Sequence, residues 1–278
     1  MNFFNLYVII WLLERLLEMS EFMNILFIGD LFGNDSVTYL EKNLQRIKQE
    51  NKINIVIANA ENVTYGKGLA ERHYNRLKKI GISCFTMGNH TFSNSEIFSY
   101  IDASSVIRPA NINTNVGQGY YLINYNGKKI CVINLMGRVF MNMSLDCPFR
   151  TLDGILENVK ADYYIVDMHA EASSEKIALG YDFDGKVDAI VGTHTHVQTA
   201  DERVLEKGTL YITDIGMTGP LNGVIGSDKE AIIERFRTGV FNKAMVANGD
   251  FQFNAVVLSI GDTKPSIKRI HEVCKNFN

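Results

Sequence analysis

The chain has 278 residues, of which 46% are hydrophobic, and its net charge of −3 comes from well-mixed acidic and basic residues. This length is enough to bury a sizeable core in one large domain or two small ones. The sequence has no long basic run, so it gives no indication of a stable nucleic-acid partner. The four cysteines show no paired short spacing, and Cys84 and Cys131 lie in apolar, strand-like runs. Free buried thiols favour a reducing, cytoplasmic compartment.

The N-terminal segment, residues 1–22, differs from the rest of the chain. Its apolar run, residues 3–13, is shorter than the roughly 20 residues that span a bilayer, so we predict no membrane span. A basic segment and a small-residue cleavage site, which would mark a signal peptide, are both missing. We interpret residues 1–22 as an upstream extension or a loosely attached helix. Met23 is the predicted natural start, and residues 23–278 are predicted to form a single domain.

The next hundred residues alternate between strand and helix patterns. Residues 24–29 form a short apolar run, and a helical stretch follows with Tyr39, Leu40, Leu44 and Ile47 on one face. Strand-like runs at 53–58 and 82–87 flank a helix-like segment at 71–81. This rhythm predicts an α/β layered fold with buried, partly parallel strands.

The second half of the chain contains more strand patterns. Asn126-Gly127 joins two strand-like runs and strongly predicts a hairpin. Further strands are expected at 162–169, 187–194, 208–216 and 251–261.

Polar residues recur at the C-terminal ends of the predicted strands. They are Asp30, Glu61, Asn62, Asn89, His90, His169, His194 and His196. In open α/β sheets the ligand crevice lies just outside these strand ends. The residues are oxygen and imidazole donors without a thiolate, a set that suits Mn, Fe or Zn. They exceed the needs of one ion, so we predict two ions, which in such sites lie roughly 3.5–4 Å apart.

Each residue taken singly also has a simpler interpretation. Asp30 and Glu61 are more often helix caps than ligands, and Asn89 alone is typical of a turn. His169 alone fits a half-buried histidine that binds no metal. His73 and His271 are interpreted as surface residues.

Two segments stay open. Glu171 either supports the site or starts the next helix. Residues 216–220 either form a loop over the site or a tight turn. Neither is included in the predicted site.

The motifs also resemble a known family. "GD" at 29–30, "GNH" at 88–90, the histidine at 169 and "GTHTH" at 192–196 look like the blocks of the calcineurin-like metallophosphoesterases, in the same order. Two blocks depart from the superfamily pattern: "DLF" at 30–32 lacks a histidine, and "NAEN" at 59–62 replaces Gly-Asp. Both departures are shared by the YmdB-like 2′,3′-cyclic-nucleotide phosphodiesterases. The chain resembles this branch from Met23 to about residue 270.

The resemblance implies a four-layer α/β/β/α sandwich with mixed sheets. It also implies the role of each polar residue. Glu61 would bridge two divalent ions, with Fe or Mn favoured and Zn as a third metal that the ligands accept. The other ligands of the first ion would be Asp30, Asn62 and His196. The other ligands of the second ion would be Asn89, His169 and His194. His90 would be a catalytic residue that binds no metal.

The implied activity is hydrolysis of a small phosphodiester. A hydroxide held between the ions would attack phosphorus, and His90 would protonate the leaving ribose oxygen. Two alternatives remain at this point: a broad-specificity phosphomonoesterase, and a metal-bound regulatory or RNA-associated protein whose catalysis is incidental. Members of the family form oligomers, so a homo-oligomer is a further expectation, although the sequence reveals no interface.

Overall fold

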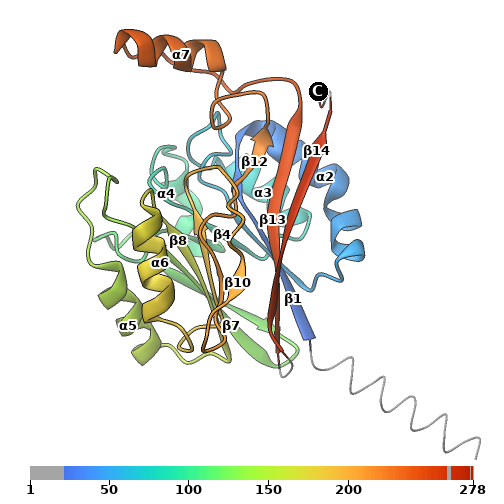
Figure 1. The fold of residues 1–278 in the computed structure, drawn as a ribbon, viewed down its shortest axis with the longest axis vertical. Coiled ribbons are helices and arrows are strands. Elements are labelled where there is room, and N and C mark those ends of the chain that lie inside the picture. Colours follow the sequence, from blue (N-terminus) through green and yellow to red (C-terminus); the bar gives the residue numbers. More distant parts are fainter. Residues whose placement is uncertain (1–21, 262–263, 276, 278) are drawn as a thin grey trace, which may run out of the picture.

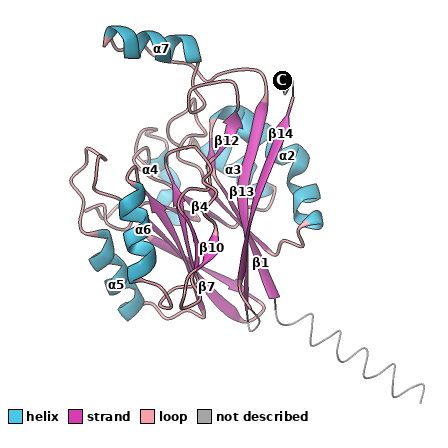
Figure 2. Ribbon diagram, viewed as in Figure 1, coloured by secondary structure: helices cyan, strands magenta, loops and turns pink. Residues whose placement is uncertain are grey.

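Two β-sheets pack face to face, and helices cover their outer faces (Figures 1 and 2). The computed structural model describes residues 22–261, 264–275 and 277. In Figure 1, α2 (Gly33–Glu50) lies at the right, α5 (Pro148–Asn158) and α6 (Ser173–Asp182) lie at the left, and the strands run between them. The predicted four-layer α/β/β/α fold with mixed sheets is confirmed.

The first sheet contains eight strands within the described residues. Its main path runs β2 (Asp30–Leu31), β12 (Met217–Pro220), β13 (Phe251–Gly261), β1 (Phe22–Ile28), β3 (Ile55–Asn59), β4 (Cys84–Thr86) and β5 (Val106–Ile107), and β14 (Ser266–Cys274) also pairs with β13. β1, β3, β4 and β5 are parallel, as the alternating pattern predicts. β13 is antiparallel to β1.

The second sheet contains six strands in the same described ranges. They run in the order β10 (Arg203–Val204), β11 (Leu210–Ile212), β9 (Ala189–Thr193), β8 (Tyr163–His169), β7 (Lys128–Met136) and β6 (Tyr120–Tyr125). The hairpin between β6 and β7 is confirmed. Asn126 and Gly127 both have positive φ angles, 47° and 78°, which a two-residue hairpin turn of this type requires.

The remaining helices are short. They are α3 (Glu71–Lys79), α4 (Ile97–Tyr100), the 3-10 helix η1 (Ile101–Ala103) and α7 (Lys229–Thr238). α2 buries Leu40, Leu44 and Ile47 at helical spacing against the first sheet, and each fully buried side chain of this size contributes roughly 1.5–3 kcal/mol. α7 differs because it buries no residue and projects away from the body at the top of Figure 1.

The core has three parts that match the layers. One part lies between the first sheet and its helices, one between the sheets, and one between the second sheet and α5 and α6. Cys84 and Cys131 are free and buried, as predicted. Cys84 lies between the two sheets, and Cys131 lies between the second sheet and its helices. None of the helices in the described part of the chain is long and apolar enough to cross a membrane.

Two expectations of the sequence are wrong. His73 is buried rather than a surface residue, with 3% of its area exposed, because it packs under the segment that precedes α3. Residues 217–220 form β12 and pair in parallel with β2, so they are neither a lid nor a simple turn. The proposed extension, residues 1–22, falls outside the described residues except for Phe22, which begins β1.

Candidate metal centre

The strand ends of both sheets meet at one place. Asp30 lies in β2, Glu61 follows β3, Asn89 follows β4, His169 ends β8 and His194 follows β9. Parallel strands of one sheet carry their carboxyl ends to the same edge, so side chains from distant segments come together there. The structure brings together all eight predicted residues at this edge.

Three side-chain atoms converge on His169. Its Nε2 atom lies 3.1 Å from Oε1 of Glu61, 3.0 Å from Oδ1 of Asn89 and 3.1 Å from Nδ1 of His194. The ligand atoms of Glu61, His169 and His194 all lie within 4.8 Å of one another. Such a cluster of carboxylate, amide and imidazole donors is typical of a transition-metal site.

The second group of predicted ligands lies beside this cluster. Nε2 of His196 is 3.9 Å from Oδ1 of Asp30. Among the described residues, that Asp30 oxygen and Oδ1 of Asn62 are buried and accept no hydrogen bond. Because leaving a buried acceptor unsatisfied costs about 1–3 kcal/mol, these oxygens fit a site built for a cation. The donor set on this side therefore suits a metal as well.

Burial and charge oppose each other in the pair formed by Glu61 and His169. Burial alone would raise the pKa of Glu61, but the adjacent His169 imidazolium lowers it to about 2. Burial alone would lower the pKa of His169, but the Glu61 carboxylate raises it to about 9. The same burial lowers the pKa of His194 to about 3, with His169 adding to the effect. Near pH 7 His194 is therefore neutral, which is the form that binds a metal, whereas His169 must give up its proton to bind one.

The turn that carries two of the histidines has an unusual backbone. His194 and His196 have positive φ angles of 97° and 66°, which residues other than glycine rarely adopt. Oδ2 of Asp214 accepts hydrogen bonds from both N and Oγ1 of Thr195, at 3.1 and 2.8 Å. Nζ of Lys176 donates to the same oxygen at 2.8 Å, and this ion pair is almost fully buried. A strained turn persists only where its surroundings hold it, and this buried pair does so.

The sequence reasoning missed both members of that pair. Asp214 follows β11, so the signal of a polar residue at a strand end was present there. Lys176 lies within α6, and nothing in the local pattern distinguishes it from a solvent-exposed helical lysine.

The position of His169 is set by two neighbouring features. Its Nδ1 lies 2.8 Å from Oγ1 of Thr193, and that hydroxyl donates to Asp167 at 2.7 Å. This chain fixes the ring so that Nε2 faces the cluster. Gly88 lies against the ring, and a Cβ at that position would be 2.2 Å from Nε2. The glycine of the "GNH" motif is thus required for the imidazole to fit.

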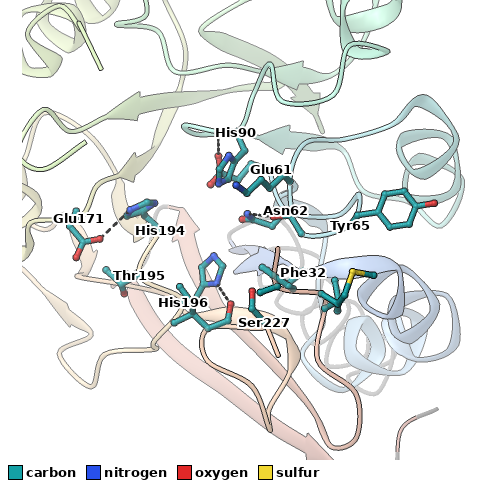
Figure 3. Close-up of a pocket in the computed structure, with 16 residues that line it drawn as sticks. Phe32, Glu61, Asn62, Tyr65, His90, Glu171, His194, Thr195, His196 and Ser227 are labelled. Carbon is teal, nitrogen blue, oxygen red and sulfur yellow. Dashed lines mark hydrogen bonds and ion pairs between the residues drawn. The ribbon is translucent and has the colours of Figure 1, made fainter. Parts of the chain in front are cut away.

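A cavity of about 380 Å³ opens over these residues (Figure 3). His90 lines it, and the backbone N–H of His90 donates to Oε2 of Glu61 at 2.7 Å. The His90 ring contacts Oγ of Ser93 through Nδ1 at 3.2 Å, and within the described residues its Nε2 makes no hydrogen bond. Burial lowers the pKa of His90. The arrangement leaves one nitrogen of a partly buried imidazole available to a bound molecule.

Two more residues complete the cavity wall. Phe32 stands where the superfamily pattern has a histidine, and its ring packs edge-on to His196 with centroids 5.5 Å apart. Oε2 of Glu171 lies 3.1 Å from Nε2 of His194 (Figure 3). Glu171, which the sequence left undecided, therefore orients a predicted metal ligand.

Comparison with known proteins agrees with this geometry. A family model described as YmdB-like protein matches residues 26–273. The 2′,3′-cyclic-nucleotide 2′-phosphodiesterase of Bacillus subtilis (strain 168) is 45% identical over 251 residues, which cover 88% of this chain and 95% of that protein.

Two crystal structures share the fold over most of their length. A novel phosphatase from Mycoplasma pneumoniae has a TM-score of 0.87 and 37% identity, covering 92% of this chain and 95% of the other. A hypothetical protein from Thermus thermophilus has a TM-score of 0.85 and 38% identity, covering 91% of this chain and all of that one. Since the family model and these relatives extend over nearly the whole described chain, the protein belongs to the YmdB-like family.

Proposed function

We propose that this protein is a phosphodiesterase that uses two divalent metal ions to hydrolyse 2′,3′-cyclic nucleotides. The observation that carries the proposal is the convergence of eight strand-end residues at one edge of the sheets, five of which line one cavity, with Nε2 of His90 left without a hydrogen bond among the described residues. The cyclic-nucleotide phosphodiesterase of Bacillus subtilis, at 45% identity, supports the substrate class.

The residues divide into two ligand sets that share Glu61. Asp30, Asn62 and His196 would hold one ion, and Asn89, His169 and His194 would hold the other. We propose Fe or Mn, with Zn as the third metal that these donors accept. When bound, such ions lower the pKa of a coordinated water and neutralise charge on the phosphoryl group.

The chain's own residues supply the remaining chemistry. Water releases a proton to the solvent, its oxygen forms a bond to phosphorus, the bond from phosphorus to the ribose 2′ oxygen breaks, and that oxygen takes up a proton. His90 is the proposed donor, through Nε2, because Ser93 already contacts Nδ1. The product is a nucleoside 3′-phosphate. The strain of the five-membered cyclic phosphate lowers the intrinsic barrier.

A diester fits the cavity better than a monoester does. Of the described residues, Lys67 is the only lysine or arginine that lines it. A monoester dianion carries more charge than a diester and would need more cationic partners. We further propose that residues 23–278 act as a single domain and that the protein is cytoplasmic.

Hydrolysis of two chromogenic esters tests the proposal. In added manganese, purified protein should hydrolyse bis-p-nitrophenyl phosphate and adenosine 2′,3′-cyclic phosphate much faster than p-nitrophenyl phosphate, and a chelator should abolish the activity. Faster turnover of the monoester would show instead a phosphomonoesterase. Inactivity on all three, with metal bound, would favour a regulatory protein.

A further inference from the structure

A second cavity, of about 540 Å³, adjoins the one over the candidate metal centre. The two cavities share Tyr65, Lys67, Ser227 and Ala244 in their walls. A molecule bound at the metal centre can therefore extend into the second cavity without crossing the body of the protein.

The walls of the second cavity are cationic. Lys67, Arg235 and Lys243 line it, and no carboxylate does so among the described residues. None of the three forms an ion pair within the part of the chain that the structure describes. Unpaired cations around a concave surface attract an anion. The cavity is thus suited to a ligand that carries negative charge beyond the phosphate at the metal centre.

The same walls carry two exposed aromatic rings. Tyr65 is 76% exposed and Phe241 is 70% exposed. The guanidinium of Arg235 lies 4.9 Å from the centroid of the Phe241 ring. Proteins that bind single-stranded nucleic acid commonly use exposed aromatic rings beside cations. The bases stack on the rings while the cations contact the phosphate backbone.

α7 contributes to the outer wall of the second cavity. Asp228 caps the helix by accepting a hydrogen bond from the N–H of Ala231, and no residue of α7 is buried. A ten-residue helix with no buried face gains little from packing. Through Arg235 it nevertheless forms a wall of the second cavity.

We propose that the second cavity binds the penultimate nucleotide of an RNA strand whose 3′ end carries a 2′,3′-cyclic phosphate. The inference rests on the proposed function and extends its substrate class from mononucleotides to short RNA ends. The terminal nucleotide lies at the metal centre, and the phosphodiester that precedes it lies among Lys67, Arg235 and Lys243. The penultimate base stacks on Tyr65 or Phe241. Such ends arise by attack of a ribose 2′ hydroxyl on the adjacent phosphodiester, so the reaction that supplies this substrate is RNA cleavage by transesterification.

The test compares adenosine 2′,3′-cyclic phosphate with the adenosine dinucleotide that ends in the same cyclic phosphate. For the unmodified protein, kcat/KM should be at least about tenfold higher for the dinucleotide, mainly through a lower KM, since each stacked base contributes about this factor. KM for the dinucleotide should also rise more steeply with salt. The double variant Arg235→Gln/Lys243→Gln should lose the preference, and Phe241→Ala should reduce it severalfold. Neither should change kcat/KM for the mononucleotide by more than about twofold.

The matched control is Lys229→Gln/Arg237→Gln. It also removes two positive charges, but from positions of α7 that do not line the cavity. It should keep the preference for the dinucleotide. Equal kcat/KM for the two substrates in the unmodified protein, or an equal loss on both in the Arg235 and Lys243 variant, would overturn the proposal.

A binding measurement separates this inference from the proposed function. Titration with the dinucleotide and mononucleotide that end in 3′-phosphate requires no turnover. Tighter binding of the dinucleotide, lost in the Arg235→Gln/Lys243→Gln variant, would support the second cavity even if neither cyclic phosphate were hydrolysed. Equal binding of the two would overturn it even if both were hydrolysed.

Discussion

His90 and His169 have different environments although both belong to the candidate site. His169 is fully buried and contacts Glu61, Asn89 and His194 through a single ring nitrogen. His90 lines the cavity and contacts Glu61 through its backbone N–H rather than through its ring. A ring with one nitrogen facing the cavity can reach a substrate, whereas a ring nitrogen surrounded by carboxylate, amide and imidazole atoms suits a metal. The structure thus supports distinct roles for residues of the same type.

Replacement of His90 by alanine should separate binding from chemistry. Metal content should stay near that of the unmodified protein, because the imidazole contacts none of the proposed ligands. The value of kcat on adenosine 2′,3′-cyclic phosphate should fall by about 10²–10⁴, the usual contribution of a general acid. Elemental analysis and steady-state kinetics measure the two effects.

The leaving group supplies the control for this variant. On bis-p-nitrophenyl phosphate the loss should be much smaller, since p-nitrophenolate leaves without a proton. An equal loss on both substrates would leave His90 with an electrostatic role and no proton transfer.

The element that places Glu61 and Asn62 is the segment between β3 and α3. Oγ1 of Thr64 contacts Nδ1 of the buried His73 at 2.9 Å and accepts a hydrogen bond from the N–H of Ala70 at 2.8 Å. This contact ties the segment to the first turns of α3. Burial, with smaller effects from Arg72 and Arg76, lowers the pKa of His73 to about 4, from 6.5 when exposed.

This shift makes the stability of the fold depend on pH. Below about pH 6.5 the unfolded chain binds a proton at residue 73 and the folded chain does not, until the pH reaches about 4. The contribution of His73 is therefore complete above pH 6.5 and is lost as the pH falls toward 4. At pH 5 the loss should be about 2 kcal/mol.

His73→Gln, which keeps a hydrogen-bonding side chain but does not titrate, is the comparison for this prediction. Urea unfolding at pH 7.5 and pH 5 should show the unmodified protein losing about 2 kcal/mol more than the variant between the two values. The same loss in both proteins would show that His73 is protonated equally in the folded and unfolded chain.

For the molecule as a whole, the candidate metal centre joins the two sheets. Glu61 follows a strand of the first sheet, and His169 ends a strand of the second. A metal that binds this pair in the folded chain alone therefore stabilises the packing of the sheets against each other, by mass action.

Added manganese should accordingly raise the melting temperature. At a concentration 100 times the dissociation constant, one ion contributes about 2.7 kcal/mol, which for a chain of this size is roughly 5–10 °C. Glu61→Ala should lose most of this increase and at least one ion, while its circular dichroism spectrum stays unchanged. Calorimetry measures the melting temperature of each protein with manganese and with a chelator, so that the increase is compared with the metal-free form of the same protein. A full increase in the Glu61→Ala protein would rule out the bridging role.

Local patterns in the sequence predicted the α/β layered fold and the polar residues at the strand ends, and the resemblance to the metallophosphoesterases implied the four layers and the role of each residue. Strand periodicity is local, so the strand ends could be read along the chain, and residues such as Asp30 and His169 could be recognised there. Their spatial convergence followed from the rule that parallel strands end at one edge.

The tertiary structure alone decided which distant residues support and extend that site. Lys176 pairs with Asp214 beneath the histidine turn, 38 positions away in the sequence, because α6 packs against the second sheet. Arg235 and Lys67 share a cavity because α7 and the segment that follows it lie beside the segment that follows β3. Burial of His73 likewise depends on packing that helix periodicity does not encode. Pairing of charges and burial of polar groups are properties of segments far apart in sequence, so only the folded chain determines them.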